Sequence, residues 1–203
     1  MAGNNIAEAV LKKYLGLGKN GKPENVAGKR PGWTVLSGIV QSRDAKNYEC
    51  VAIGTGIKSL AESQLGHAGQ CLNDSHAEII CRRSFKLYIV QQVQKCIDGL
   101  ESVIQKTGAY YEVKNEIRFS MYISQSPCGD ASMCALESQQ SQEVRNANLT
   151  NKRKYDELHS SEKRGMFSGE KVLRGRDDFN AIGMLRTKPG RVDAQPSLSM
   201  SCR

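Results

Sequence analysis

The stretch HAEIICRRSFKLYIVQQVQKCI, residues 76–97, carries the strongest helix signal in the chain and opens with His76 and Glu78. Its apolar residues recur at the spacing of a helix that packs along one side. We expect the buried face to consist of Ile79, Ile80, Leu87, Val90 and Val93. An imidazole and a carboxylate in one helical turn can bind a metal and move a proton. The stretch therefore predicts a core helix with reactive groups at its N-terminus.

The segments on either side of this helix predict an α/β protein. Residues 117–123 alternate between apolar and polar side chains, which is the period of a strand. Gly54 and Gly56 could belong to a phosphate-binding loop, but the dinucleotide fingerprint is incomplete and a strand-ending turn is favoured. The expected elements are a helix at 5–17, a hairpin of strands at 33–41 and 48–53, the helix at 76–97, a strand at 117–123, a helix within 127–136 and a strand at 181–187.

The composition favours a protein with free thiols and a basic surface. The 203 residues carry a net charge of +8, from 29 lysines and arginines against 21 acidic residues. Such a surface attracts nucleic acid, although a high isoelectric point without such a partner explains the charge equally well. Seven scattered cysteines indicate the cytoplasm, the nucleus or both. We expect no signal peptide and no membrane span, and no feature marks a protein partner.

Residues 138–180 differ in composition from the rest of the chain. They mix basic and acidic residues with Gln, Asn and Ser, and they contain few large apolar side chains. A segment of this kind cannot bury enough surface to fold by itself. We predict a polar, mobile insert within a chain that otherwise forms one domain.

Further along the chain, two thiols could complete a metal site with His76. Cys128 follows Pro127 and precedes an expected helix start, where a thiolate is stabilised. The general nucleobase-deaminase signature, H-x-E with P-C-x-x-C, places a second thiol three residues later, but that position holds Ala131. The thiol of Cys134 would not point towards a metal bound by Cys128, so Cys202 must be considered as the third ligand.

Two simpler interpretations compete with the metal site. Ser75 and Glu78 match a capping box, in which the glutamate only accepts a backbone N–H. Buried cysteines often act as small apolar residues, and we interpret Cys50, Cys81, Cys96 and Cys134 in this way. If the metal site is correct, zinc would activate a water molecule and Glu78 would carry protons in the hydrolytic removal of an amine from a nucleobase.

Four segments together resemble the adenosine-to-inosine RNA editases. They are LNDSHAEIICRR at residues 72–83, SPCGDAS at 126–132, RTKPGR at 186–191 and SMSC at 199–202. The N-terminal motifs GKPEN at 21–25 and WTVL at 33–36 look most like the eukaryotic branch that acts on tRNA, next to the anticodon of alanine tRNA. The resemblance implies a cytidine-deaminase-like mixed sheet with helices on both faces, and zinc-dependent conversion of adenosine to inosine in tRNA.

The resemblance also implies roles for individual residues. His76, Cys128 and Cys202 match the zinc ligands, and Glu78 matches the residue that carries protons. The family buries inositol hexakisphosphate, and Asn73, Arg82 and Arg83 match residues that bind it; from their spacing alone, the two arginines could equally form an exposed basic face. Asp74 and Lys188 match a polar relay between this cofactor and the metal, and Lys58 matches a lysine near the substrate phosphates.

The chain also departs from the family pattern. Members continue beyond SMSC for a long C-terminal half, whereas this sequence ends at Arg203, and Val192 stands where the family has glycine. We therefore expect residues 1–203 to be the N-terminal part of an editase domain, with little or no activity alone. The alternatives are a non-catalytic RNA-binding fragment of such an enzyme and an editase that acts on another RNA. Oligomeric state and preference for flanking nucleotides cannot be inferred from the sequence.

Overall fold

The computed structural model describes residues 2–24, 28, 31–43, 46–66, 68–138, 141–143, 146, 175, 182–188 and 197–202. They fall into two compact units. The first comprises Met1–Lys58 and Ser75–Gln125, and the second comprises Ser59–Asp74 and Ser126–Arg203. Each unit is described by itself.

The first unit is built on an antiparallel sheet of three strands in the order β2-β1-β7, with bounds Lys46–Thr55, Leu36–Arg43 and Ile117–Ile123. The predicted hairpin and the predicted strand at 117–123 are therefore confirmed. The register between β1 and β2 shifts after Ile39, so that Ile39 pairs with Ala52 and Val40 pairs with Cys50. Paired residues share a face of the sheet, and this bulge directs Cys50 and Ala52 to opposite faces.

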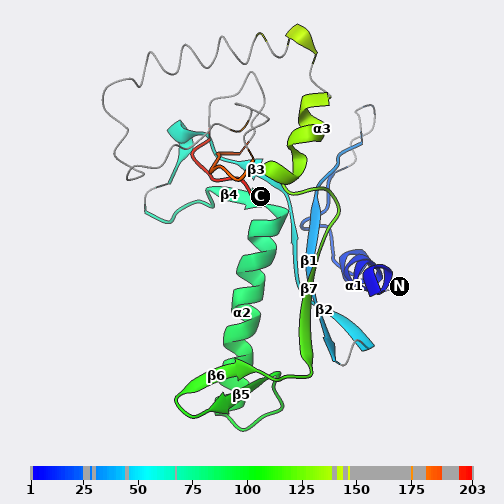
Figure 1. Ribbon diagram of the computed structural model, residues 1–203, viewed down its shortest axis with the longest axis vertical. Helices are drawn as coiled ribbons and strands as arrows, with labels where there is room; N and C mark the ends of the chain where they lie inside the picture. The colour runs from blue at the N-terminus through cyan, green and yellow to red at the C-terminus, as the bar shows by residue number, and fades with distance from the viewer. Residues whose placement is uncertain are drawn as a thin grey trace. The chain divides into compact units, whose positions relative to one another are not determined.

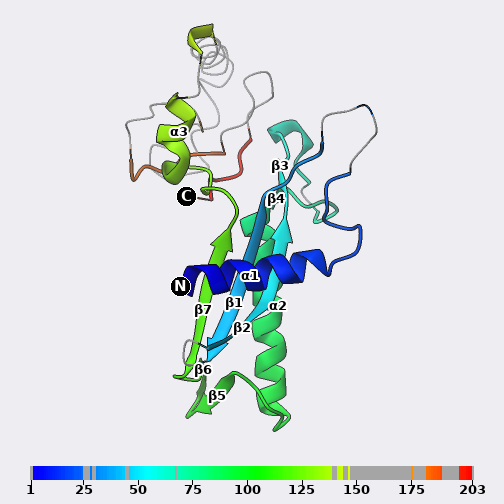
Figure 2. The ribbon, with the colours of Figure 1, turned by 90° about the vertical axis from the view of Figure 1, so that its right-hand side faces the viewer.

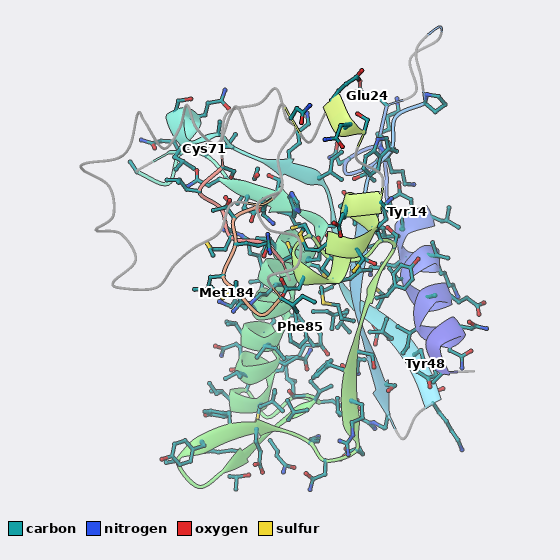
Figure 3. The ribbon with its side chains drawn as sticks, turned by 45° about the horizontal axis from the view of Figure 1, so that its top comes forward. Tyr14, Glu24, Tyr48, Cys71, Phe85 and Met184 are labelled. Carbon is teal, nitrogen blue, oxygen red and sulfur yellow. The ribbon has the colours of Figure 1, made fainter. Side chains whose placement is uncertain are left out.

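Helices cover both faces of this sheet, which confirms the predicted fold class. Helix α1 (Ala2–Leu15) crosses the strands on one face, and α2 (Ala77–Ile97) packs on the other (Figures 1 and 2). Between α1 and the sheet lies a cluster of Val10, Leu36, Val40 and Cys50, with Tyr14 and Tyr48 packed against it (Figure 3). Between α2 and the sheet lies a second cluster of Ile39, Ala52 and Cys81, flanked by Phe85 and Phe119.

The predicted buried face of α2 is partly wrong. Leu87 and Val90 are 59% and 64% exposed, whereas Ala77, Cys81 and Gln92 are buried. The buried stripe follows the helical period but combines small, aromatic and amide side chains, so its apolar signal is weak. Gln92 is buried because its carboxamide oxygen accepts hydrogen bonds from Ser102 Oγ and from the Val103 backbone, both at 3.2 Å.

The glycines of the predicted turn have a packing role. A Cβ on Gly54 would lie 2.4 Å from the carbonyl oxygen of Ala77 and 2.5 Å from the amide nitrogen of Cys81. Gly56 has φ of 145°, and a Cβ there would lie 1.9 Å from the carbonyl oxygen of Ser75. These contacts are with backbone atoms, so only glycine at 54 lets the start of α2 lie this close to β2, and only glycine at 56 lets Ser75 of β4 lie this close to the chain that follows β2.

Two further strand pairs were not predicted from the sequence. Strands β5 (Ile104–Thr107) and β6 (Tyr110–Val113) form an antiparallel hairpin after α2. Strands β3 (Ile57–Ser59) and β4 (Asp74–His76) form a second short pair. All four strands have four residues or fewer, which is too short for an alternating pattern to stand out.

The second unit contains little regular structure among its described residues. It has the single turns η1 (Glu62–Gln64) and η2 (Asp130–Ser132), followed by α3 (Met133–Ser138). The strand expected at 181–187 is wrong for the described residues 182–187, which hold only isolated bridge positions at Arg186 and Thr187, and Thr187 pairs antiparallel with Met200. Most of the insert predicted at 138–180 lies outside the described residues. Among the residues described, no helix has the length and apolarity needed to cross a membrane.

Candidate metal centre

The segment that leads to Asp74 is held in place by its own loop. The carboxamide oxygen of Asn73 accepts a hydrogen bond from the Gly66 amide at 3.1 Å, and the Asn73 carbonyl accepts one from the Leu60 amide at 2.9 Å. Ser197 Oγ donates to the Leu60 carbonyl at 3.1 Å, which ties this loop to the C-terminal segment. These contacts restrict the backbone that carries the Asp74 carboxylate.

A tight turn presents Cys128. Gly129 follows it with φ of 111°, a conformation that other residues rarely adopt. The Gly129 carbonyl then accepts hydrogen bonds from the amide and the hydroxyl of Ser132, at 2.9 and 3.1 Å. The expected helix start is thus a 3-10 turn beginning at Asp130, with α3 beginning only at Met133.

Cys202 is carried by a short antiparallel ladder. The Lys188 amide donates to the Ser199 carbonyl at 2.8 Å, and the Ser201 amide donates to the Arg186 carbonyl at 2.9 Å. The Cys202 amide donates to the sulfur of Cys128 at 3.3 Å. Residues 74 positions apart are thereby brought into contact, which sequence spacing alone could not establish.

The ammonium group of Lys188 lies among the two thiols and a carboxylate. Its Nζ donates to the sulfur of Cys202 at 2.8 Å and to that of Cys128 at 3.6 Å, and it lies 3.4 Å from Asp74 Oδ2. The Lys188 side chain is only 2% exposed. A buried ammonium needs nearby negative charge, so this arrangement favours ionised sulfur.

The electrostatics of this cluster follow from the same contacts. Burial by itself would lower the pKa of Lys188, but the hydrogen bond to Cys202 and the charges of Cys128 and Asp74 outweigh it and raise that pKa. The hydrogen bond with Cys128, and then burial, raise the pKa of Cys202 against the opposing effect of Lys188. A metal that binds the Cys202 sulfur must displace any proton that it carries.

The first unit contributes His76 and Glu78 at the start of α2. His76 is the N-cap residue of this helix, makes no side-chain capping bond, and is half-buried. Glu78 lies in the first turn and is also half-buried. The capping-box interpretation is wrong, because Ser75 lies in β4 rather than at the N-cap. Both side chains thus remain candidates for chemistry.

Among the described residues, His76, Cys128 and Cys202 form a group whose side chains could hold a metal ion. This set has the same members as the predicted ligands, and a possible metal site is therefore present. Cys50 and Cys81 are buried, as their interpretation as small apolar residues requires. That interpretation is wrong for Cys134, which is exposed.

Three further predicted site residues are exposed on the first unit. Arg82 and Arg83 are exposed on α2, and Lys58 is exposed on β3. The exposed arginines match the alternative of a basic face.

Sequence reasoning assigned no role to Asp130 and Arg186. Asp130 Oδ1 lies 3.7 Å from Arg186 Nε, and Asp130 Oδ2 accepts the Gly183 amide at 2.8 Å. Their positions could have been a signal, since each lies within two residues of a cluster member, Cys128 or Lys188.

Comparison with known proteins agrees with the resemblance of this sequence to the editases. A family model described as the adenosine-deaminase (editase) domain matches residues 52–203. The tRNA-specific adenosine deaminase 1 of Schizosaccharomyces pombe is 36% identical over 98% of this chain, and that of Drosophila melanogaster is 34% identical over 97%. The protein of the same name from Saccharomyces cerevisiae is 32% identical over 98%. The chain covers 49%, 46% and 50% of these proteins, or about half the length of the curated relatives it matches.

Proposed function

The chain belongs to the adenosine-deaminase (editase) domain family, and on that premise we propose that it carries the metal-binding and proton-transfer residues for converting adenosine to inosine in tRNA. Three similar proteins are named as tRNA-specific adenosine deaminases, and the net charge of +8 suits an RNA substrate. The observation that carries the proposal is the pair of thiols around Lys188, with a His/Cys/Cys set of suitable ligand types.

Zinc is the metal that this ligand set favours. One imidazole and two thiolates are donors that zinc prefers, and three protein ligands leave a fourth position for water. We propose His76, Cys128 and Cys202 as these ligands. The Lys188 ammonium would lower the cost of placing two sulfur anions side by side, and it fits a site whose ligands must be deprotonated.

In the proposed reaction, Glu78 is the residue that moves protons. Bound zinc would supply a water acidic enough to lose a proton near neutral pH. The Glu78 carboxylate would accept that proton at one of its Oε atoms while the water oxygen bonds to the ring carbon that carries the amine. It would then donate the proton to the departing nitrogen, so that the carbon–nitrogen bond breaks and ammonia leaves. Its half-buried position in the first turn of α2, two residues after His76, supports the role.

We propose inositol hexakisphosphate as a second bound group. Arg82 and Arg83 are exposed and would be available to phosphate groups. The Asn73 carboxamide already bonds to Gly66, so it would have to contribute with its remaining hydrogen-bonding capacity. When bound, this group would supply six phosphates to basic side chains. Asp74 and Lys188 would then form the polar relay to the metal ligands.

Metal content tests the ligand assignment. The purified 203-residue chain is expected to hold one zinc per molecule by elemental analysis, and Cys128→Ser and Cys202→Ser are each expected to lose it. Cys134→Ser is the matched control, since it removes an exposed thiol from a nearby helix. Equal zinc content in all four proteins would refute the assignment.

Glu78→Gln tests the proton-transfer role separately. This change should leave zinc content unchanged and lower any tRNA deamination rate by about 100-fold or more, the usual effect of removing a general acid–base group. Inosine formation in alanine tRNA would be measured for both proteins, with Glu112→Gln, an exposed glutamate on β6, as the control. Deamination at the unaltered rate by Glu78→Gln would contradict the role.

A further inference from the structure

Arg186 is the largest fully buried side chain among the described residues. Its side chain is 0% exposed, and its Nε lies 3.7 Å from Asp130 Oδ1, a distance typical of an ion pair rather than a hydrogen bond. Asp130 is 14% exposed and also accepts the Gly183 amide at 2.8 Å through its other oxygen. A charge is costly to bury, so a buried pair of this kind calls for a reason beyond general stability.

The position of the pair suggests that reason. Asp130 begins the turn that immediately follows Cys128 and Gly129. Arg186 belongs to the strand-like segment that carries Lys188, and its carbonyl accepts the amide of Ser201, the residue before Cys202. The side chain of Arg186 therefore contacts the Cys128 turn, while its backbone holds the Cys202 segment.

We propose that the Arg186–Asp130 pair is a positioning device that sets the separation of the Cys128 and Cys202 sulfurs for metal binding. The inference rests on the proposed function, because it assumes that both sulfurs are ligands. Neither side chain binds the metal. The pair fixes two chain segments that are far apart in sequence, and Asp130 adds a second tie through the Gly183 amide.

Arginine suits this role better than lysine. The guanidinium group is planar, always charged and more weakly hydrated than an ammonium, so it costs less to bury beside a carboxylate. Partners outside the ligand set that orient metal ligands typically change metal affinity by 10- to 100-fold when removed. The same loss is expected here, although Arg186 and Asp130 themselves contact no metal.

The experiment is a cobalt(II) titration of the full 203-residue chain, followed by the visible spectrum of the thiolate-bound ion. Arg186→Met removes the charge and keeps much of the volume, and Asp130→Asn removes the ion pair but keeps an oxygen that can accept the Gly183 amide. Asp130→Asn is the milder change and serves if Arg186→Met fails to fold. Arg43→Met is the matched control, because Arg43 is 47% exposed and lies 4.0 Å from Glu101 in the first unit.

Cobalt affinity is expected to fall 10- to 100-fold in Arg186→Met and in Asp130→Asn, with an altered spectrum at saturation, and to stay unchanged in Arg43→Met. The double variant should bind no more weakly than Arg186→Met alone, because the two side chains act as one unit. A general folding defect would lower the amount of cobalt bound at saturation, whereas a misplaced sulfur lowers the affinity and changes the spectrum.

Two results would overturn the inference in different ways. If the unaltered chain binds cobalt and both single variants match it in affinity and spectrum, the metal site stands and the positioning role is wrong. If the unaltered chain binds no cobalt, the proposed metal site is wrong, and the positioning role is rejected with it.

Discussion

The two units of this protein bury different kinds of residue. Of the twelve buried apolar residues in the described part of the chain, eleven belong to the first unit, and Met133 alone belongs to the second. Both units bury polar residues, but the two buried charged side chains of the described part, Arg186 and Lys188, belong to the second unit, whereas the first buries only serines and Gln92. The first unit thus depends on apolar packing across a sheet, whereas the second depends on charge pairs and hydrogen bonds between loops.

The largest expected difference between the units is their response to metal removal. Chelation should abolish amide protection in residues 126–138, 182–188 and 197–202, because metal binding contributes on the order of 10 kcal/mol in small domains with few apolar contacts. Residues 36–55 and 77–97 should keep their protection, since their clusters need no metal. Hydrogen exchange with mass spectrometry, with and without chelator, measures both regions at once. Equal loss of amide protection in both regions would contradict the expected difference between the two units.

The second prediction tests how closely α2 packs on the sheet of the first unit. Gly54→Ala places a methyl group against backbone atoms at 2.4 and 2.5 Å, which cannot move aside, and it should destabilise this unit by about 3 kcal/mol. Gly38→Ala is the matched control, because the three atoms nearest to its methyl group all belong to the Val10 side chain, the closest at 2.6 Å, rather than to the backbone. The control should cost about 1 kcal/mol. Urea unfolding gives both values, and equal losses would contradict the packing argument.

The smallest expected effect is a loss of stability in the first unit at alkaline pH. Burial raises the pKa of the Cys50 thiol from its usual 9.0 to about 11. Above pH 9 the unfolded chain releases this proton while the folded chain keeps it, so stability falls as pH rises and the loss is complete near pH 11. The contribution is about 2.7 kcal/mol, since each pKa unit corresponds to about 1.36 kcal/mol.

Cys50→Ala isolates this contribution. Both proteins would be unfolded in urea under reducing conditions at several pH values between 8 and 11. The variant should lose less stability over this range than the unaltered chain, whatever its stability at pH 8. Parallel curves would show that the Cys50 thiol does not contribute.

Long elements with a clear period were predictable from the sequence, and short or mixed ones were not. The strand at 117–123 and the helix at 76–97 were placed to within a residue, because a single period runs through each. The hairpin formed by β5 and β6 was missed because its strands have four residues each. The buried face of α2 was misjudged because its stripe includes Gln92, which is buried through hydrogen bonds rather than apolarity.

The sequence by itself determined the functional groups of the candidate site. They are an imidazole and a carboxylate two residues apart, a thiol in a Pro-Cys-Gly turn, and a second thiol near the chain end. Local spacing is sufficient to identify such residue types. The contact between Cys128 and Cys202, the burial of Lys188 between them and the pairing of Arg186 with Asp130 were decided only by the tertiary structure. Apart from the bond between Lys188 and Cys202, which are 14 residues apart, these contacts join residues at least 56 positions apart. Such pairings depend on how the whole chain packs, which no local pattern records.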